Sequence, residues 1–371
     1  MVLVVAVAAL VVALFLSADA IHRKAEGRPN QAEWRKTMSQ AVVNIADTFR
    51  VDAPSKAVDD AVGPLIGHER KTGQQSTDEI LAAKRAAEGE DPAATEVTVP
   101  GQSTVPGQAA APPTTIDKTP KLRAPTPDNP LKVWVGGDSI AYDPGVAMSN
   151  FSSKTKLMTV TQDSRASTGL VRSDFFNWPE HLFRDVVPTA PDVMMIMYGG
   201  NDAQGIAAGP GKAYVYGSAE WQAEYRKRVG DTMDLLKSKD NNRLVIWMGM
   251  PPVAPTSSIK NMDMMNFIFF TEAQKRPWVK FFDSWPFFTG TDGAYSLSLT
   301  SADGSTHVMR ATDGVHFSQT GGERFGWAVY AKLSTLVDFA AAPALVPDPK
   351  SAPPPDIKER TDIPPAANQS G

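Results

Sequence analysis

The sequence predicts an α/β protein, a three-layer α/β/α sandwich built around a mainly parallel five-stranded sheet. Short apolar runs alternate with helical segments from Leu131 onward, and the runs that begin at Val193 and Leu244 are almost continuously apolar. Continuous apolar runs are typical of strands that are buried on both faces of a parallel sheet. Glycine pairs that favour turns follow the runs at Gly136 and Gly199. Alternation of this kind places helices on both faces of one sheet.

The expected elements follow in chain order. Strands are expected at residues 131–135, 156–161, 193–198, 244–250 and 279–282. Helices are expected at residues 221–237, 262–274 and 323–339. Polar and apolar residues alternate over 295–309 around Asp303 and Gly304, which predicts a β-hairpin inserted before the last helix. Together these elements make one domain, residues 131–340, of a normal size for this fold class.

Two segments have a composition that predicts disorder. Residues 89–129 are rich in Pro, Ala, Thr and Gln, and residues 341–371 have the same character. Such segments bury too little apolar surface to offset the entropy that is lost on ordering. We therefore expect a flexible tether before the domain and a disordered Pro/Ala-rich tail after it.

The N-terminal residues bear on the location of the protein. Val2 to Leu16 form an unbroken apolar run, and small residues follow it at Ala18 and Ala20. Three interpretations of residues 1–21 are open: a transmembrane anchor, a cleaved signal peptide, or a buried helix. We favour an uncleaved single-pass anchor in the cell membrane with the domain on the extracytoplasmic side, and a secreted protein is the alternative. The basic residues that follow the run are unusual on the exported side of an anchor.

Residues 33–50 are a second candidate for membrane contact. Apolar residues recur there at helical spacing, which predicts one amphipathic helix. The helix either lies near the membrane surface or docks on the main domain, and the sequence leaves both options open.

Composition excludes several classes of function. The formal net charge is −4, and the basic and acidic residues are interspersed, so no nucleic-acid partner is expected. The chain has no cysteine, which excludes a cysteine nucleophile, a thiolate zinc site and a disulfide. The sequence contains no phosphate-binding loop and no cluster with metal-ligand spacing, so neither a cofactor nor a metal is expected. The oligomeric state stays open.

Ser139 follows the first expected strand, directly after Gly136, Gly137 and Asp138. Ligands bind at the carboxyl ends of the strands in an open parallel sheet, so this serine is placed for a catalytic site. The two glycines allow a tight turn and the close approach of a substrate. The alternative role of Ser139 is that of an N-cap for the next helix, a very common position for serine.

Further polar residues occupy the ends of other expected elements. Asn201 follows the third strand, and its amide is a good donor to a developing oxyanion, although such a Gly-Gly-Asn-Asp motif is also a common turn. Asp313 precedes His316 on a short loop before the last helix, where a carboxylate can orient an imidazole and stabilise the imidazolium. The alternative for this pair is a surface ion pair. A second histidine, His307, falls on the expected hairpin and is assigned to its surface.

The order of these motifs along the chain, from Ser139 through Asn201 to Asp313 and His316, resembles the SGNH hydrolases, a group of GDSL-like esterases and acyltransferases. The resemblance covers residues 133–331, which is nearly the whole expected domain. It implies a flavodoxin-like SGNH fold. The N-terminal anchor and tether also resemble those of membrane-anchored bacterial members.

The resemblance implies a role for each matched residue. The matched residues are the nucleophile Ser139, the catalytic pair Asp313 and His316, and the oxyanion-hole donors Gly169 and Asn201. Gly169 is the candidate for the family's glycine block because it follows the second expected strand. Ile140 stands where the family name has leucine, which is an apolar exchange without catalytic consequence.

The function that the resemblance implies is serine-dependent chemistry on a carboxylic ester, with an acyl-enzyme on Ser139. The expected substrate is a small-molecule or glycan ester, such as an O-acylated cell-envelope glycan or lipid. Hydrolysis and O-acyl transfer to an envelope polysaccharide use the same residues, so both remain open. A third possibility is a non-catalytic envelope-binding protein on a hydrolase fold.

Overall fold

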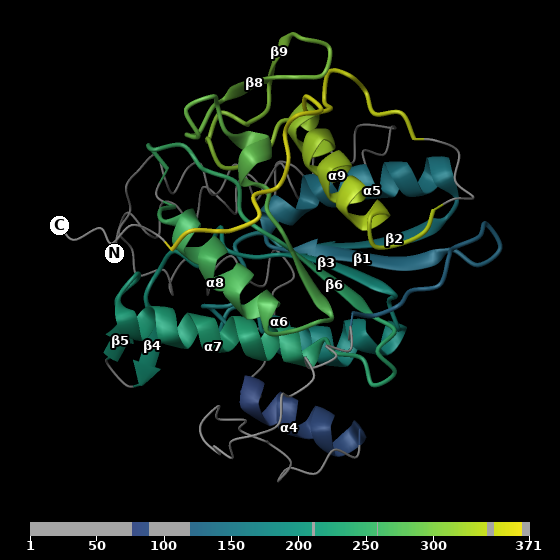
Figure 1. The fold of residues 1–371 in the computed structure, drawn as a ribbon. Helices are drawn as coiled ribbons and strands as arrows, with labels where there is room; N and C mark the ends of the chain where they lie inside the picture. Colours follow the sequence, from purple (N-terminus) through teal and green to yellow (C-terminus); the bar gives the residue numbers. More distant parts are fainter. Residues whose placement is uncertain (1–75, 89–118, 210–211, 258, 340–344, 366–371) are drawn as a thin grey trace, which may run out of the picture. The chain divides into compact units, whose positions relative to one another are not determined.

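The computed structural model describes residues 76–88, 119–209, 212–257, 259–339 and 345–365 (Figure 1). Apart from Asp174–Phe176, these residues belong to one compact unit. The expected anchor at 1–21, the expected helix at 33–50 and residues 89–118 of the expected tether lie outside the described residues. No helix within the described ranges combines the length and the apolar composition that crossing a bilayer requires.

The domain is built on a five-stranded sheet in which all neighbouring strands are parallel. In spatial order the strands are β2 (Met158–Ser164), β1 (Leu131–Gly137), β3 (Val193–Met197), β6 (Leu244–Met248) and β7 (Val279–Phe282). β3 and β6 are buried along their whole length, as their continuous apolar sequences predict. The parallel arrangement brings the carboxyl ends of all five strands to one edge of the sheet.

Helices cover both faces of the sheet, which gives the three layers that the sequence predicts (Figure 1). On one face lie α5 (Tyr142–Thr155) and α9 (Gln319–Ser334); on the other lie α6 (Trp178–His181), α7 (Ala219–Leu235) and α8 (Met262–Gln274), with α4 (Thr77–Glu88) packed on α7. The α/β/α sandwich with a parallel five-stranded sheet is therefore confirmed.

Short elements complete the domain. The described residues form two antiparallel hairpins, and the second, β8–β9, forms where the alternation of polar and apolar residues predicts it. The short elements are β4 (Ile206–Gly209), β5 (Lys212–Tyr214), β8 (Ser298–Thr300), β9 (Thr306–Val308), the 3-10 helices η2 (Ser139–Ala141), η4 (Val187–Thr189) and η5 (Trp285–Phe288), and the π-helix η3 (Leu182–Val186).

Several element boundaries differ from the expected ones by a few residues, and two of these differences have a clear physical reason. β2 begins two residues late because Lys156 adopts the left-handed conformation that ends α5. α9 begins at Gln319 because Ser318 caps it, accepting a hydrogen bond from the Gly321 N–H at 3.0 Å. This cap offsets the low helix propensity of the two glycines in the first turn.

The described part of the C-terminal segment, residues 345–365, packs on the domain. Ile363 is buried, and Arg360 forms a two-pronged ion pair with the buried carboxylate of Asp283, with N–O distances of 2.6 and 2.9 Å. The prediction of disorder for residues 341–371 is therefore wrong over this stretch. A few anchoring side chains hold a Pro-rich segment that has little apolar surface of its own, which average composition does not reveal.

The end of the expected tether, residues 119–129, also contacts the domain. Arg123 donates hydrogen bonds to the carbonyls of Asn129 and Pro130 at 2.5 and 2.7 Å, and it lies 3.3 Å from the Asp192 carboxylate. The prediction of a tether extending to residue 129 is therefore too long.

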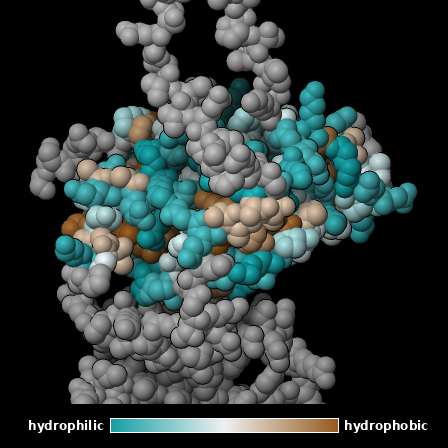
Figure 2. Space-filling model, turned by 90° about the horizontal axis from the view of Figure 1, so that it is seen from below, coloured by the Kyte–Doolittle hydropathy of each residue, from teal (hydrophilic) through white to brown (hydrophobic). Residues whose placement is uncertain are grey.

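α4 is a helix that the sequence does not predict. It buries Ile80 and Leu81, and it exposes Ala82 and Ala86. Figure 2 shows the surface from below, the side on which α4 lies in Figure 1: hydrophilic residues dominate, and a smaller apolar patch lies near the centre. The burial of Ile80 and Leu81 shows that α4 packs on the domain through a narrow apolar stripe.

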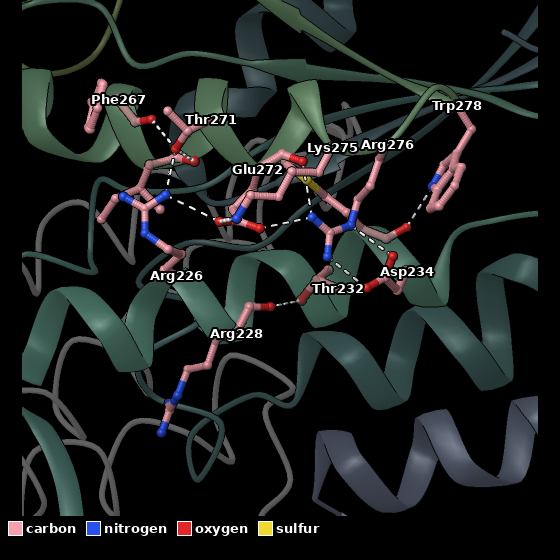
Figure 3. Close-up of polar contacts among 12 residues, drawn as sticks. Arg226, Arg228, Thr232, Asp234, Phe267, Thr271, Glu272, Lys275, Arg276 and Trp278 are labelled. Atoms are coloured by element: carbon pink, nitrogen blue, oxygen red, sulfur yellow. Dashed lines mark hydrogen bonds and ion pairs between the residues drawn. The ribbon is translucent and has the colours of Figure 1, made fainter. Parts of the chain in front are cut away.

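A network of charged side chains joins α7 to α8 (Figure 3). Glu272 is almost fully buried and accepts from three cations: Lys275 at 2.7 Å, Arg276 at 2.9 Å and Arg226 at 3.2 Å. Arg276 also reaches the Asp234 carboxylate through two nitrogens at 2.8 and 2.7 Å. Burial alone would raise the pKa of Glu272, but the hydrogen bonds from its cations outweigh burial and lower it.

Replacing Glu272 by alanine is expected to lower the free energy of unfolding by about 3 kcal/mol at neutral pH, because it removes the buried carboxylate that three cations share, although Arg276 keeps its ion pair with Asp234. Because the folded pKa of Glu272 is lowered, its contribution is complete above the unfolded pKa and disappears as the pH falls through the folded pKa. Denaturant unfolding of both proteins at neutral and acidic pH measures this. Lys227→Ala, which removes exposed ion pairs with Asp78 and Asp231, is the control and is expected to cost less than about 1 kcal/mol. Equal decreases in the free energy of unfolding of Glu272→Ala and Lys227→Ala would contradict this role of the buried carboxylate.

Candidate active site

The turn that follows β1 presents Ser139 at the carboxyl edge of the sheet. Gly137 has a φ of +142°, and a Cβ there would lie 1.9 Å from the carbonyl oxygen of Met197, so this position requires glycine. Asp138, and not Ser139, caps η2: its carboxylate accepts a hydrogen bond from the Ile140 N–H at 2.9 Å. The N-cap alternative for Ser139 is therefore wrong.

Ser139 instead points at a histidine from the far end of the chain. Its Oγ lies 2.8 Å from Nε2 of His316, and Nδ1 of His316 lies 2.7 Å from Oδ2 of Asp313. The second oxygen of Asp313 accepts hydrogen bonds from the backbone N–H groups of Val315 at 2.8 Å and His316 at 2.9 Å. The carboxylate therefore fixes the loop as well as the imidazole, and the three predicted residues form one continuous chain of hydrogen bonds.

Asp313 and His316 shift each other's pKa in opposite directions. Burial alone would raise the pKa of Asp313, but hydrogen bonds from His316 and from backbone N–H groups outweigh it and hold this pKa well below its usual range. Burial alone would lower the pKa of His316, but the hydrogen bond and the charge of Asp313 outweigh it and raise this pKa. Asp313 is therefore ionised at neutral pH and accepts the Nδ1 proton, which leaves Nε2 of neutral His316 to accept the Ser139 proton.

The two predicted oxyanion donors lie on loops that are joined to each other. The side-chain amide of Asn201 donates to the carbonyl of Thr168 at 3.0 Å, which orients the amide and leaves its second N–H group for another acceptor. Gly169 follows Thr168, and among the described residues its backbone N–H donates to no acceptor. A Cβ on Gly169 would lie 2.2 Å from Oδ1 of Asp202, so a larger residue does not fit.

Two buried aspartates that are not among the predicted site residues, Asp138 and Asp202, hold these loops together. Asp138 accepts a hydrogen bond from the Gly200 N–H at 2.9 Å and so joins the Ser139 turn to the Asn201 turn. Burial raises the pKa of Asp138 to about 7, against the opposing effect of its backbone hydrogen bonds. Asp138 precedes Ser139 and Asp202 follows Asn201 in the sequence, and this adjacency is the signal that could have identified both aspartates.

Asp202, the second of these aspartates, joins the Asn201 turn to the Gly169 loop. It accepts hydrogen bonds from the Val171 N–H at 2.8 Å and from the Tyr225 hydroxyl at 2.7 Å. Burial raises its pKa, and the hydrogen bond from Tyr225 opposes the rise. No spacing in the sequence connects Tyr225, on α7, to this site.

Other candidate features lie away from Ser139. His307 pairs with Asp303 at 2.8 Å on the β8–β9 hairpin and takes no part in the Ser139 cluster. A cavity of about 160 Å³ lies between α5, α9 and residues 346–351, and its lining includes neither Ser139 nor His316. Within the described ranges, no group of three or more His, Asp or Glu side chains is arranged to hold a metal ion.

Several solved structures resemble the chain. A lipase/acylhydrolase from Enterococcus faecalis is 17% identical, with a TM-score of 0.38, over 55% of this chain and 96% of that one. A carbohydrate acetylesterase from Sinorhizobium meliloti is 14% identical, with a TM-score of 0.39, over 56% and 99% of the two chains. The M. smegmatis aryl esterase is 14% identical, with a TM-score of 0.39, over 56% and 100%.

No curated protein sequence matches the chain. The model of one protein family, described as "Protein of unknown function (DUF459)", matches residues 132–332, which is more than half of the chain and nearly all of the α/β domain. The matched region begins in β1 and ends in α9, so it contains Ser139, Asn201, Asp313 and His316. The chain belongs to the DUF459 family.

Proposed function

We propose that this protein is a serine esterase that hydrolyses a carboxylic ester through an acyl-enzyme on Ser139. The observation that carries the proposal is the chain of hydrogen bonds at the sheet edge, with 2.8 Å from Ser139 to His316 and 2.7 Å from His316 to Asp313. A nucleophile, a base and a group that orients the base are the elements that acyl transfer to serine requires.

In the proposed first step, the Ser139 Oγ bonds to the ester carbonyl carbon while its proton passes to Nε2 of His316. The oxyanion accepts hydrogen bonds from the Asn201 amide and from the backbone N–H groups of Ser139 and Gly169. Collapse of the tetrahedral intermediate breaks the bond to the leaving alkoxide, which takes the proton from His316. Water then repeats the sequence on the acyl-enzyme and releases a carboxylic acid.

The proposed substrate is an O-acylated cell-envelope glycan or lipid. This choice rests on the sequence, whose residues 1–21 predict a membrane anchor and a domain on the extracytoplasmic side. Transfer of the acyl group to a second envelope alcohol would use the same acyl-enzyme with a different acceptor.

The test of this function is a substrate panel with purified protein. Short-chain and long-chain aryl esters and an O-acetylated oligosaccharide are each incubated with the protein, and the released acid and alcohol are quantified. Equal amounts of acid and alcohol indicate hydrolysis, and alcohol in excess of acid when a glycan acceptor is added indicates transfer. Absence of turnover on every ester, with the protein folded, would overturn the proposal.

Replacing Asn201 by alanine is expected to lower kcat by about 10²- to 10³-fold with little change in KM, because the lost donor acts on charge that develops only in the transition state. Steady-state kinetics on an aryl ester measure both constants. Asn242→Ala is the control, since Asn242 bonds to Ser238 just before β6, at the opposite edge of the sheet. A rise in KM with kcat unchanged would remove Asn201 from the oxyanion hole.

A further inference from the structure

Arg310 is a buried charged residue at the base of the Asp313–His316 loop, and the proposed chemistry does not use it. Arg310 is 1% exposed, and among the described residues it forms no ion pair with a carboxylate. Its Nε atom is buried without a hydrogen-bond partner. Burial lowers the pKa of Arg310 to about 10, and the residue remains a cation at neutral pH.

Aromatic rings and backbone carbonyls surround this guanidinium. Its Cζ lies 4.7 Å from the ring centre of Phe317, 5.2 Å from that of Phe288 and 5.9 Å from that of Tyr295. Contacts with ring faces stabilise a desolvated cation. If the Arg310 side chain served only to fill this space, an apolar side chain of the same length would do so without the cost of burying a charge.

The two terminal nitrogens of Arg310 hold two separate loops. One donates to the carbonyl of Val315, the residue between Gly314 and His316, at 2.8 Å. The other donates to the carbonyl of Pro252, on the loop that follows β6. The same two loops are joined beside it, where the Ala254 N–H donates to the carbonyl of Gly314 at 2.9 Å.

Arg310 also closes the base of the His316 loop. It pairs with Phe317 in an isolated β-bridge, and the N–H of the next residue, Ala311, donates to the carbonyl of His316 at 2.9 Å. The loop is therefore fixed at its base by backbone bonds, at Asp313 by the carboxylate, and at Val315 by the guanidinium.

We infer that Arg310 is a positioning residue that holds the Asp313–His316 loop against the loop after β6, so that His316 stays in register with Ser139. The inference rests on the proposed function, and Arg310 acts through His316 without touching substrate. The planar guanidinium is required because its two terminal nitrogens bond to two carbonyls at once, whereas the single ammonium nitrogen of lysine cannot hold both in the same geometry.

The experiment compares Arg310→Met and Arg310→Lys with Arg324→Met in the full chain. Arg324 is a matched control: it is 2% exposed and donates to the carbonyls of Phe287 and Thr300, outside the catalytic loop. Thermal unfolding of each variant is measured first, and kinetics are run well below the lowest Tm. Wild type and Ser139→Ala are included in the same assay.

Both Arg310 variants are expected to lose about 100-fold in kcat, the size of effect that a displacement of about 1 Å produces, with KM changed less than about threefold. Arg324→Met is expected to keep its kcat within about threefold at a comparable loss of stability. A third variant, Arg310→Ala, leaves room for a free cation, and added guanidinium at millimolar concentration is expected to restore part of its kcat. Wild-type kcat in Arg310→Met would overturn the inference. So would losses of kcat in Arg310→Met and Arg324→Met that are both in proportion to the decrease in Tm.

A second readout does not need turnover. The Nδ1 proton of His316, hydrogen-bonded to Asp313, is expected to give a downfield proton resonance in wild type and Arg324→Met, and to shift or vanish in Arg310→Met. The polar groups around this loop whose state bears on that resonance are Asp313 and Ser139, which bond to the imidazole, the nearby carboxylates of Asp138 and Asp143, and Tyr295. An unchanged resonance in Arg310→Met overturns the inference, whereas an inactive wild type with the expected resonances overturns the proposed function alone.

Discussion

Replacing Ser139 by alanine is expected to lower kcat on an aryl ester by about 10⁵- to 10⁶-fold. The remaining rate is the small acceleration that the oxyanion donors and substrate binding give without a nucleophile. The variant removes the only atom that the proposed mechanism acylates. It also removes the 2.8 Å contact with His316, and the hydroxyl makes no other hydrogen bond to the described part of the chain. The fold is expected to be retained because Asp138, and not Ser139, caps the following turn.

Ser149→Ala is the matched control for this variant. Ser149 lies on α5, ten residues further along the chain, and its hydroxyl accepts a hydrogen bond from Gln162 at 2.8 Å. Its loss is expected to leave kcat unchanged. Ester turnover in Ser139→Ala within tenfold of wild type, at an unchanged Tm, would show that another group is the nucleophile.

Replacing Asp313 by asparagine is expected to lower kcat by about 10⁴-fold at neutral pH, because the amide no longer holds the productive tautomer of His316 or stabilises its cation. The pH dependence has a definite sign. Asp313 raises the pKa of His316, and His316 must be neutral to accept a proton, so activity in wild type rises as the pH passes upward through this raised pKa. Without the carboxylate the pKa falls, and the acid limb of the kcat/KM profile moves to lower pH.

Asp303→Asn provides the control for Asp313→Asn. Asp303 holds the imidazole of His307 at 2.8 Å on the β8–β9 hairpin, so the change has the same chemistry at a second Asp–His pair. Its kcat and pH profile are expected to match those of wild type. An Asp313→Asn profile with its acid limb unmoved would show that the titrating base is not His316.

Much of the fold is predictable because local pattern and buried position agree. The runs at Val193 and Leu244 are apolar throughout, and they form the two strands that are covered on both faces. Helix α8 and strand β7 match their expected bounds because apolar runs and turn residues define both ends. The glycines in the first turn of α9 conceal its start, which depends on the Ser318 cap.

What the sequence does not predict depends on contacts between distant residues. The C-terminal segment is held by Arg360 on Asp283, seventy-seven positions apart. Composition averages a segment over its length and does not register one ion pair with a buried partner. The same reasoning applies to the part of the expected tether that Arg123 fixes.

The residues of the candidate site also fall into a group that the sequence predicts and a group that it does not. Ser139, Asn201, Asp313 and His316 are recognisable because a parallel sheet brings the ends of its strands to one edge, so the order of the motifs along the chain implies their proximity. The residues that hold these loops belong to no such order. Tyr225 lies on α7 and Arg310 at the base of the His316 loop, and their contacts with the loops exist only in the folded protein.

The most direct test of an acyl-enzyme on Ser139 is covalent labelling with a fluorophosphonate, followed by intact-mass measurement and peptide mapping. One label per chain is expected, on the peptide that contains Ser139, with a labelling rate that rises as the pH passes upward through the pKa of His316. The Ser139→Ala protein is expected to take up none. A label on a different residue, or ester turnover that continues in a protein that takes up no label, would contradict the assignment of Ser139 as the nucleophile.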